Sequence, residues 1–276
     1  MKNLSRPPVD MELIQEHFES YGAALTRRLE IAATHASALS TVVSTARTLA
    51  GSVAVVQPQS DELCRALRIG VRAAAALFAV ATGNGMVEVD LGEMRTKLPA
   101  TGPTDATHAG HWRVGWWFSH ILRDRQTIES LTATPVDVLR HSSTRGDECQ
   151  YLFVEALQAF EKRSADFSAK LRAAIDATDP EKIALVDEEF VLNILVPEMQ
   201  MLLRLAVGQA QPFNEALRYS LERHAKYWSK GKRKQDPDGF LALGPLALAA
   251  KAHDAGIHLD IDSDYLPSRL VKGECR

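Results

Sequence analysis

Four residues near the middle of the chain have the side chains that metal sites and acid–base catalysts use. His108 and His111 stand three residues apart, so in a helix they share one face. His120 and Asp124 stand four apart, the spacing of a histidine base oriented by a carboxylate. His120 follows His111 by nine residues, about half a turn around a helix, so it points away from the first pair. A metal at His108 and His111 would need ligands from elsewhere in the fold.

Other signals of catalysis or cofactor binding are missing from the sequence. It has no H-E-x-x-H or C-x-x-C metal motif and no G-x-S-x-G nucleophile motif. Gly83-Asn84-Gly85 lacks the third glycine of a dinucleotide fingerprint, and the Asp260–Asp264 segment departs from a calcium loop at its sixth and twelfth positions. We predict no catalytic residue, no cofactor and no metal. A helical metal-dependent or hydrolytic enzyme that uses His108, His111, His120 and Asp124 is the alternative hypothesis.

Apolar residues at spacings of three and four predict helices along most of the chain. Ser60 can cap one helix, Gly83 can end it, and Gly256 can end the last one. Pro197 should kink or break the helix that contains it. The expected helices cover residues 11–29, 34–49, 60–83 and 107–124, a short segment after Pro135, then 148–163, 181–207, a helix from Pro212 and a last one from Pro245.

The inner faces of two of these helices follow from the pattern. The first should bury Met11, Ile14, Phe18, Tyr21 and Leu25. In the helix 107–124, tryptophans 112, 116 and 117 leave it aromatic nearly all the way round, which favours burial in the core over an exposed interface.

A short alternating stretch is the only strand signal that the sequence gives. Val87, Val89 and Leu91 alternate with acidic residues, and residues 95–98 can return beside them. We therefore predict an all-α fold, a multi-helix bundle or array with at most one small β-hairpin near residues 86–98. The 276 residues can form a single helical domain or two packed lobes, residues 1–100 and 107–270, with the loop after Ala100 as the boundary.

Composition and charge exclude several classes of protein. The net charge of −3 lacks the basic excess of a nucleic-acid-binding domain, so direct nucleic-acid binding is not expected. The longest near-continuous apolar run, residues 73–81, is too short to span a bilayer, and the N-terminus lacks a secretory signal. The three cysteines are far apart and odd in number, which fits a reducing compartment. We expect a cytoplasmic protein without membrane contact.

Charges are unevenly spread near the C-terminus. Residues 218–234 hold seven Lys or Arg, including the run Lys230–Lys234, and residues 236–264 hold six Asp. Each run, like the acidic triplet 187–189, is expected to be a solvated surface.

Several separated motifs resemble one family of bacterial proteins, immunity protein 49, in order and spacing. The most distinctive is the segment from Asp236 to Leu246, D-P-D-G-F-L-A-L-G-P-L, with Tyr265-Leu266-Pro267 downstream. The other matching motifs are His108-Ala-Gly-His111-Trp112, Leu122-Arg123-Asp124, Pro135 to Arg140, Asp147-Glu148, Val154 to Gln158, Phe213 to Leu217, and His224 with Tyr227-Trp228. The resemblance covers residues 107–270, and the first 80 residues contribute only helical character.

This resemblance implies a helical immunity protein of a polymorphic toxin system. Such a protein has no catalysis of its own and neutralises a cognate toxin domain by binding over its working surface in competition between bacteria. Because many such toxins act on nucleic acids, a nuclease or another toxin with a basic surface is the expected partner. The predicted partner-binding residues are the acidic Asp236, Asp238, Asp254, Asp260 and Asp262. A housekeeping helical adaptor with a stable endogenous partner is the third hypothesis.

Overall fold

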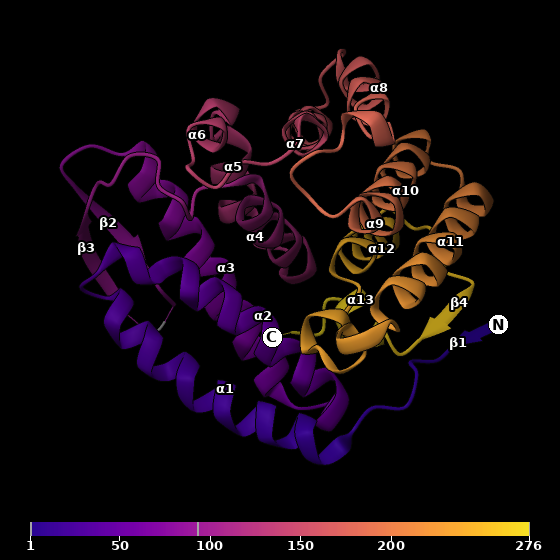
Figure 1. The fold of residues 1–276 in the computed structure, drawn as a ribbon, viewed down its shortest axis with the longest axis horizontal. Coiled ribbons are helices and arrows are strands. Elements are labelled where there is room, and N and C mark those ends of the chain that lie inside the picture. The colour runs from indigo at the N-terminus through magenta and orange to yellow at the C-terminus, as the bar shows by residue number, and fades with distance from the viewer. Residues whose placement is uncertain (1, 93, 276) are drawn as a thin grey trace.

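A computed structural model describes residues 2–92 and 94–275 and consists mostly of helices, as predicted. The helices surround α4 (Ala109–Leu122), which contacts α2, α3, α5, α7, α12 and α13 (Figure 1). In chain order the α-helices are α1 (Met11–Ala32), α2 (Leu39–Val56), α3 (Asp61–Thr82), α4, α5 (Arg125–Ala133), α6 (Val136–Arg140), α7 (Glu148–Glu161), α8 (Phe167–Asp176), α9 (Glu188–Phe190), α10 (Val196–Val207), α11 (Ala210–Trp228), α12 (Leu243–Asp254) and α13 (Ser268–Val271). Short 3-10 turns are η1 (Ala36–Ala38), η2 (Pro180–Lys182), η4 (Gly231–Gln235) and η5 (Pro237–Gly239), and η3 (Val191–Leu195) is a π-helix.

Helix α3 begins and ends where the sequence signals place it, whereas α2 runs over Leu39–Val56 instead of the predicted 34–49. The Ser60 hydroxyl accepts a hydrogen bond from the backbone N–H of Glu62 at 3.2 Å, and Gly83 caps the C-terminus of α3. The predicted inner stripe of α1 is buried or half-buried from Ile14 onward. Met11 is 53% exposed, so its predicted burial is wrong: it is the first residue of the helix, and the core begins one turn later.

Two small β-structures accompany the helices. Strands β2 (Met86–Asp90) and β3 (Arg95–Pro99) form the predicted antiparallel hairpin, with Met86 opposite Pro99. Strands β1 (Lys2–Leu4) and β4 (Ile261–Ser263) pair in parallel and join the two ends of the chain (Figure 1). The sequence does not predict this second pair, because each strand has only three residues and its partner lies far along the chain.

Pro197 breaks the regular helix, as predicted, but the surrounding elements differ from the expected 181–207 helix. Residues before Glu188 form turns, and the π-helix η3 runs directly into α10, in which Pro197 is the second residue. Because proline has no backbone N–H to donate, the hydrogen-bond pattern must change in the preceding turn. Helices α5 and α8 were not predicted.

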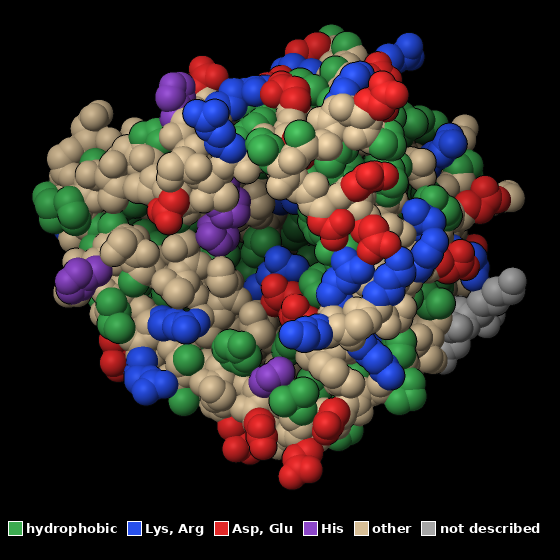
Figure 2. All heavy atoms as spheres, in the orientation of Figure 1, with side chains coloured by type: hydrophobic (Ala, Val, Ile, Leu, Met, Phe, Trp, Pro, Cys, Tyr) green, Lys and Arg blue, Asp and Glu red, His purple; other side chains and the backbone are tan. Residues whose placement is uncertain are grey.

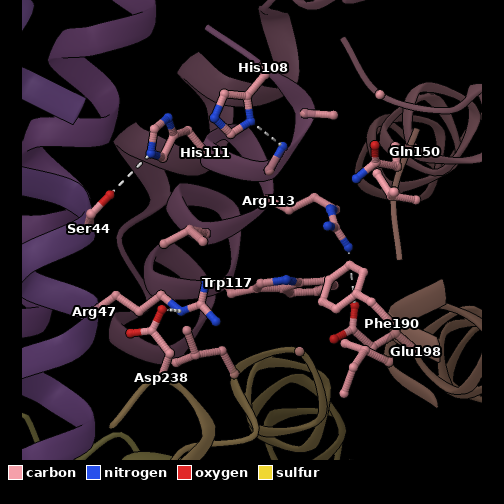
Figure 3. A pocket seen from close by; sticks show the side chains of 18 of the residues that line it. Ser44, Arg47, His108, His111, Arg113, Trp117, Gln150, Phe190, Glu198 and Asp238 are labelled. Atoms are coloured by element: carbon pink, nitrogen blue, oxygen red, sulfur yellow. Dashed lines mark hydrogen bonds and ion pairs between the residues drawn. The ribbon is translucent and has the colours of Figure 1, made fainter. Parts of the chain in front are cut away.

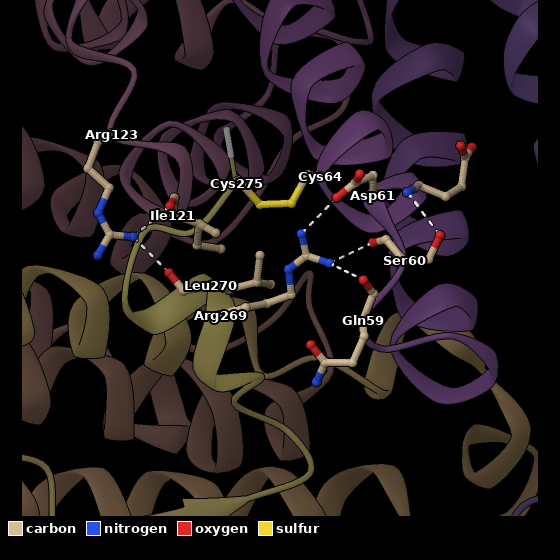
Figure 4. The surroundings of a disulfide bond; sticks show 10 residues. Gln59, Ser60, Asp61, Cys64, Ile121, Arg123, Arg269, Leu270 and Cys275 are labelled. Atoms are coloured by element: carbon tan, nitrogen blue, oxygen red, sulfur yellow. Dashed lines mark hydrogen bonds and ion pairs between the residues drawn. A yellow bond between two sulfur atoms is a disulfide. The ribbon is translucent and has the colours of Figure 1, made fainter.

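The C-terminal segment is fastened to α3 by a disulfide between Cys64 and Cys275, whose Cα atoms lie 5.4 Å apart (Figure 4). The Arg123 guanidinium donates to the carbonyl oxygen of Leu270 at 2.7 Å, and Arg269 donates to that of Gln59 at 2.6 Å. The spacing of the three cysteines does not indicate this pair, because its two members are 211 residues apart in the sequence. Cys149 is free and buried.

The buried apolar residues form one cluster that runs from Leu25 to Val271. The three tryptophans of α4 are 0 to 4% exposed, which confirms their prediction as core residues. The Trp112 indole N–H donates to the carbonyl oxygen of Leu131 at 2.9 Å, so its polar atom is satisfied inside the core. The division into lobes 1–100 and 107–270 stays a prediction.

Two helical segments are long and apolar enough to cross a membrane by length and composition alone. They are Ala36–Val56 and Glu188–Val207, and 61% and 50% of their apolar windows are buried inside the fold. Because the buried core helix of a soluble protein passes the same test, this is weak evidence for a membrane span.

Candidate functional site

A pocket of about 370 Å³ opens at the centre of the molecule, where the space-filling view shows a hollow (Figure 2). Residues from α2, α4, α7, α9, η3, α10, α11, η5 and α12 line it, together with the loop before α7. Its volume lies within the usual range for small-ligand sites, about 300 to 1,000 Å³. The pocket therefore gathers distant parts of the chain around one space.

The first two histidines of the predicted group lie on one wall of this pocket (Figure 3). Their ring centroids are 4.3 Å apart. Nδ1 of His108 accepts a hydrogen bond from the backbone N–H of Gly110 at 3.1 Å, so His108 caps the N-terminus of α4. Nδ1 of His111 lies 2.8 Å from the Ala106 carbonyl oxygen and must donate to it, which leaves Nε2 to accept from the Ser44 hydroxyl at 3.3 Å. Both rings are therefore held by the protein itself.

The surroundings of these two histidines favour their neutral forms. Burial lowers the pKa of His108 to about 4, and the neighbouring His111 and Arg113 lower it further. Burial also lowers the pKa of His111, against the raising effect of its bond to the Ala106 carbonyl. Burial therefore disfavours the positively charged form of both rings.

Opposite them, Arg113 of α4 and Glu198 of α10 form a buried ion pair (Figure 3). Their side chains are 7% and 5% exposed, and the nearest nitrogen and oxygen atoms are 3.8 Å apart, too far for a hydrogen bond. Among the described residues, Nε of Arg113 and Oε2 of Glu198 have no hydrogen-bond partner. Burial raises the pKa of Glu198 to about 7, although Arg113 and Arg47 act to lower it.

A second ion pair lies at the edge of the same pocket. Nε of Arg47 is 3.3 Å from the carboxylate of Asp238, which also accepts from the Thr48 hydroxyl at 2.9 Å. Asp238 is thus the one member of the predicted aspartate set that lines the pocket. Its η5 turn packs against α2 at Gly51, where a Cβ would overlap the Pro237 carbonyl oxygen.

The other two residues of the alternative enzyme hypothesis lie at the far end of α4. His120 stands twelve residues after His108, about 18 Å along the helix axis at 1.5 Å per residue. Its Nε2 is 3.3 Å from the Glu161 carboxylate, which accepts from Lys251 at 2.7 Å, and burial lowers the pKa of His120 to about 4. Asp124 caps α5 and lies 3.4 Å from Arg72. The structure does not bring the four residues together.

Metal ligands do not converge either. Across residues 2–92 and 94–275, no group of three or more His, Cys, Asp or Glu side chains is placed to hold an ion. The His108 and His111 pair has no third ligand in that part of the chain.

The remaining predicted partner-binding aspartates lie in separate surroundings. Asp236 accepts from the backbone N–H of Asp238 in the η5 turn. Asp254 binds Arg123 through two hydrogen bonds of 2.9 and 3.0 Å, at the end of α12. The backbone of Asp260 donates to Asn214, and Asp262 is exposed on β4. Whether any of them binds a partner stays a prediction.

The basic run and the acidic triplet, each expected to be a solvated surface, partly neutralise each other. Arg233 donates to Glu189 at 2.6 Å and to Asp187 at 3.2 Å, and Lys230 also pairs with Glu189. The two segments are more than 40 residues apart in the sequence, so composition alone could not pair them.

Sequence reasoning missed the charged residues that define the pocket, namely Arg47, Arg113 and Glu198. One signal for Arg113 was present: it stands between Trp112 and Trp116 on a helix that is apolar nearly all round, so its charge had to be buried and paired. Nothing local marks Glu198 as its partner.

The fold is therefore that of an all-α protein with a central pocket lined by charged residues, and comparison with known families places it further. The sequence profile of the family Immunity protein 49 matches residues 57–270, more than half of the chain. The chain belongs to this family, which confirms the resemblance found in the sequence. No curated protein and no solved structure matches the chain.

Proposed function

We propose that this protein binds the toxin domain of a polymorphic toxin system and neutralises it by steric occlusion, without catalysis of its own. The observation that carries the proposal is the family match over residues 57–270. The separation of His108 and His111 from His120 by the length of α4 agrees with it, since the alternative enzyme requires these side chains in one polar pocket. No observation favours the adaptor.

An inhibitor of this kind needs tight binding over a large surface. Neutralisation inside a cell requires nanomolar affinity or better, about −12 kcal/mol. A contact of that strength usually buries about 1,600 Å². The expected partner is a nuclease or another toxin with a basic surface, which the exposed aspartates would face.

The direct test is co-expression with the toxin domain encoded beside this gene. Cells should survive when both are expressed and die when the toxin is expressed alone. The purified proteins should form a complex with a Kd in the nanomolar range, measured by titration calorimetry with a catalytically inactive toxin. A toxin domain of unrelated sequence serves as the control. Failure of rescue together with absence of a complex would refute the proposal.

The cytoplasm is the proposed location, and the disulfide provides a test of it. Disulfides persist in oxidising compartments and are rare in the cytoplasm. Trapping of free thiols in intact cells, followed by mass spectrometry, should find Cys64 and Cys275 reduced if the protein acts in the cytoplasm. Finding them linked would move the proposed location to an oxidising compartment.

A further inference from the structure

Arg113 is a buried cation whose donors are incompletely used. Its only acidic neighbour within ion-pair distance among the described residues is Glu198, at 3.8 Å, and its Nε has no hydrogen-bond partner there. Leaving a charged donor buried and unpaired is costly, so such a group has a strong tendency to bind an acceptor that enters the pocket.

The charges that line the pocket favour an anion. Three arginines, Arg47, Arg113 and Arg145, face two carboxylates, those of Asp238 and Glu198. Asp238 is bound to Arg47 and Thr48, and Arg145 makes no ion pair with any described residue. Arg145 is exposed to solvent, so when Glu198 is protonated the pocket holds one buried charge without a counter-ion, that of Arg113. One such charge matches a singly charged carboxylate better than a dianionic phosphate.

Much of the remaining lining is apolar, beside the polar Ser44, Gln150 and the histidines. Trp117 and Phe190 lie next to the buried ion pair (Figure 3), and other apolar lining residues are Val43, Val114, Tyr151, Ile194 and Trp228. A ligand that fills this space has an apolar body as well as its charge.

We infer that the central pocket binds a carboxylate carried on a short apolar stem, with Arg113 as the residue that receives the charge. The carboxylate can belong to an acidic side chain of the toxin, in which case the inference rests on the proposed function, or to a free small molecule. In either case Glu198 competes with the ligand for Arg113.

The competition makes binding depend on pH. Because the pKa of Glu198 is raised to about 7, this carboxyl is mostly protonated at pH 6.5 and leaves Arg113 available, whereas at pH 8 it is ionised. If only the protonated form is competent, the affinity at pH 8 is about eightfold lower than at pH 6.5. The other ionisable groups around the pair do not reverse this trend: the pKa values of His108, His111 and His224 are lowered by burial, and burial raises that of Cys149 to about 11. Arg47, Arg145, Asp238 and Tyr151 also line the pocket.

The test uses the purified full-length chain and three probes of increasing stem length: phenylacetate, 3-phenylpropionate and 4-phenylbutyrate. Saturation-transfer NMR and calorimetry should detect saturable binding of at least one of them and none of the neutral 3-phenylpropionamide. E198Q should bind that probe about tenfold more tightly than the wild type at pH 8, with the pH dependence removed. The double variant R113M/E198Q, which leaves no lone buried charge, should bind at least about tenfold more weakly than E198Q.

R172M, which removes an exposed arginine of α8 outside the pocket, is the matched control and should leave probe binding unchanged. The inference is overturned if none of the three carboxylates binds either the wild type or E198Q at pH 6.5, or if R113M/E198Q binds as well as E198Q. If the double variant does not fold, the inference is still tested by comparing the probe affinity of E198Q with that of the wild type at different pH values.

A second experiment distinguishes a carboxylate supplied by the toxin from one supplied by a free small molecule. A toxin that inserts an acidic side chain displaces the bound probe, whereas a probe that remains in the toxin complex indicates a free small carboxylate as the natural ligand. Because probe binding is measured without toxin, its failure is distinguishable from a failure of toxin neutralisation.

Discussion

Replacing Glu198 by glutamine should change how the stability of the protein depends on pH. Glu198 is 4% exposed, and burial raises the pKa of its carboxyl group from the ordinary value of 4.5 to about 7. Below pH 4.5 it is protonated in both the folded and the unfolded chain, and its stabilising effect is complete. Between pH 4.5 and 7 the unfolded chain loses the proton while the folded chain keeps it, so the free energy of unfolding falls.

The magnitude follows from the size of the change in pKa. At 1.36 kcal/mol for each pH unit, the full cost is about 3 kcal/mol, and about 2 to 3 kcal/mol of it develops between pH 5 and pH 8. Glutamine has nearly the same shape and does not titrate. The difference in unfolding free energy between E198Q and the wild type should therefore shift by that amount in favour of E198Q over this range.

Buried histidines complicate the profile of either protein taken alone. Burial lowers the pKa of His108, His120 and His224 to about 4. Their folded pKa values are depressed, so the stability they contribute is present above pH 6.5 and lost as the pH falls toward 4, opposite to the trend from Glu198. Subtracting the wild-type curve from the variant curve removes this shared part.

The assay is urea unfolding monitored by circular dichroism at half-unit intervals from pH 5 to pH 8. E222Q, at an exposed position of α11, is the matched control and should give a curve parallel to that of the wild type. If the curve of unfolding free energy against pH for E198Q is also parallel to that of the wild type, or if E198Q loses stability relative to the wild type as pH rises, the reasoning is wrong. The ion pair with Arg113 then outweighs the cost of burying the charged Glu198.

Three further substitutions test how the fold is held together. C275S should lower the free energy of unfolding by about 2 to 5 kcal/mol, as should reduction of the wild type with dithiothreitol, because the Cys64 disulfide closes a loop of more than 200 residues; equal urea midpoints with and without reductant would contradict this. G51A should destabilise the protein by about 2 to 4 kcal/mol, because the new Cβ overlaps a backbone carbonyl oxygen. G22A, where nothing lies within 4 Å, should instead stabilise α1 by up to about 1 kcal/mol. Thermal unfolding should therefore show a lower midpoint for G51A and a higher one for G22A than for the wild type. D147A should make the loop before α9 more mobile, because the Asp147 carboxylate accepts hydrogen bonds from three consecutive backbone N–H groups there at 2.9 to 3.1 Å. The rate of amide hydrogen exchange should increase in this loop and stay unchanged in α1.

Elements with local signals could be predicted from the sequence. The capping hydroxyl of Ser60 and the glycines at 83 and 256 mark helix ends within one turn, and alternation marks the hairpin at residues 86–99. Helix α8 escaped prediction although its apolar face packs against α7. The β1–β4 pair and the disulfide depend on residues more than 200 positions apart, so no local pattern reports them.

The residues of the pocket could likewise be predicted only in part from the sequence. His108, His111 and Asp238 stood out by residue type and motif, and the fold places all three around the pocket. The Arg113–Glu198 pair forms only in the folded chain, where burial raises the pKa of Glu198 although Arg113 acts to lower it. Residue types can therefore be read from a sequence, while the environment that sets their charge cannot.

Several residues that carry the family resemblance join distant segments of this chain. Besides Asp147, Asn214 donates to the carbonyl oxygen of His258 at 2.8 Å, and Nε2 of His224 lies 2.8 Å from the carbonyl oxygen of Gly239. Such buried bonds are expensive to leave unmade, so these positions specify the scaffold.

Most of the charged residues that line the pocket are not among those that carry the family resemblance. Arg47, Arg113 and Glu198 lie outside the motifs that carry the resemblance, although they are positioned by the helices that those motifs hold in place. The Arg113–Glu198 pair can be replaced as a unit at little cost to the fold, because a buried ion pair contributes little net stability once desolvation is counted, whereas removal of one partner leaves a buried charge unpaired. Membership of the family therefore identifies the architecture, whereas under the proposed function the choice of toxin would depend on the particular side chains that line the pocket and the exposed surfaces.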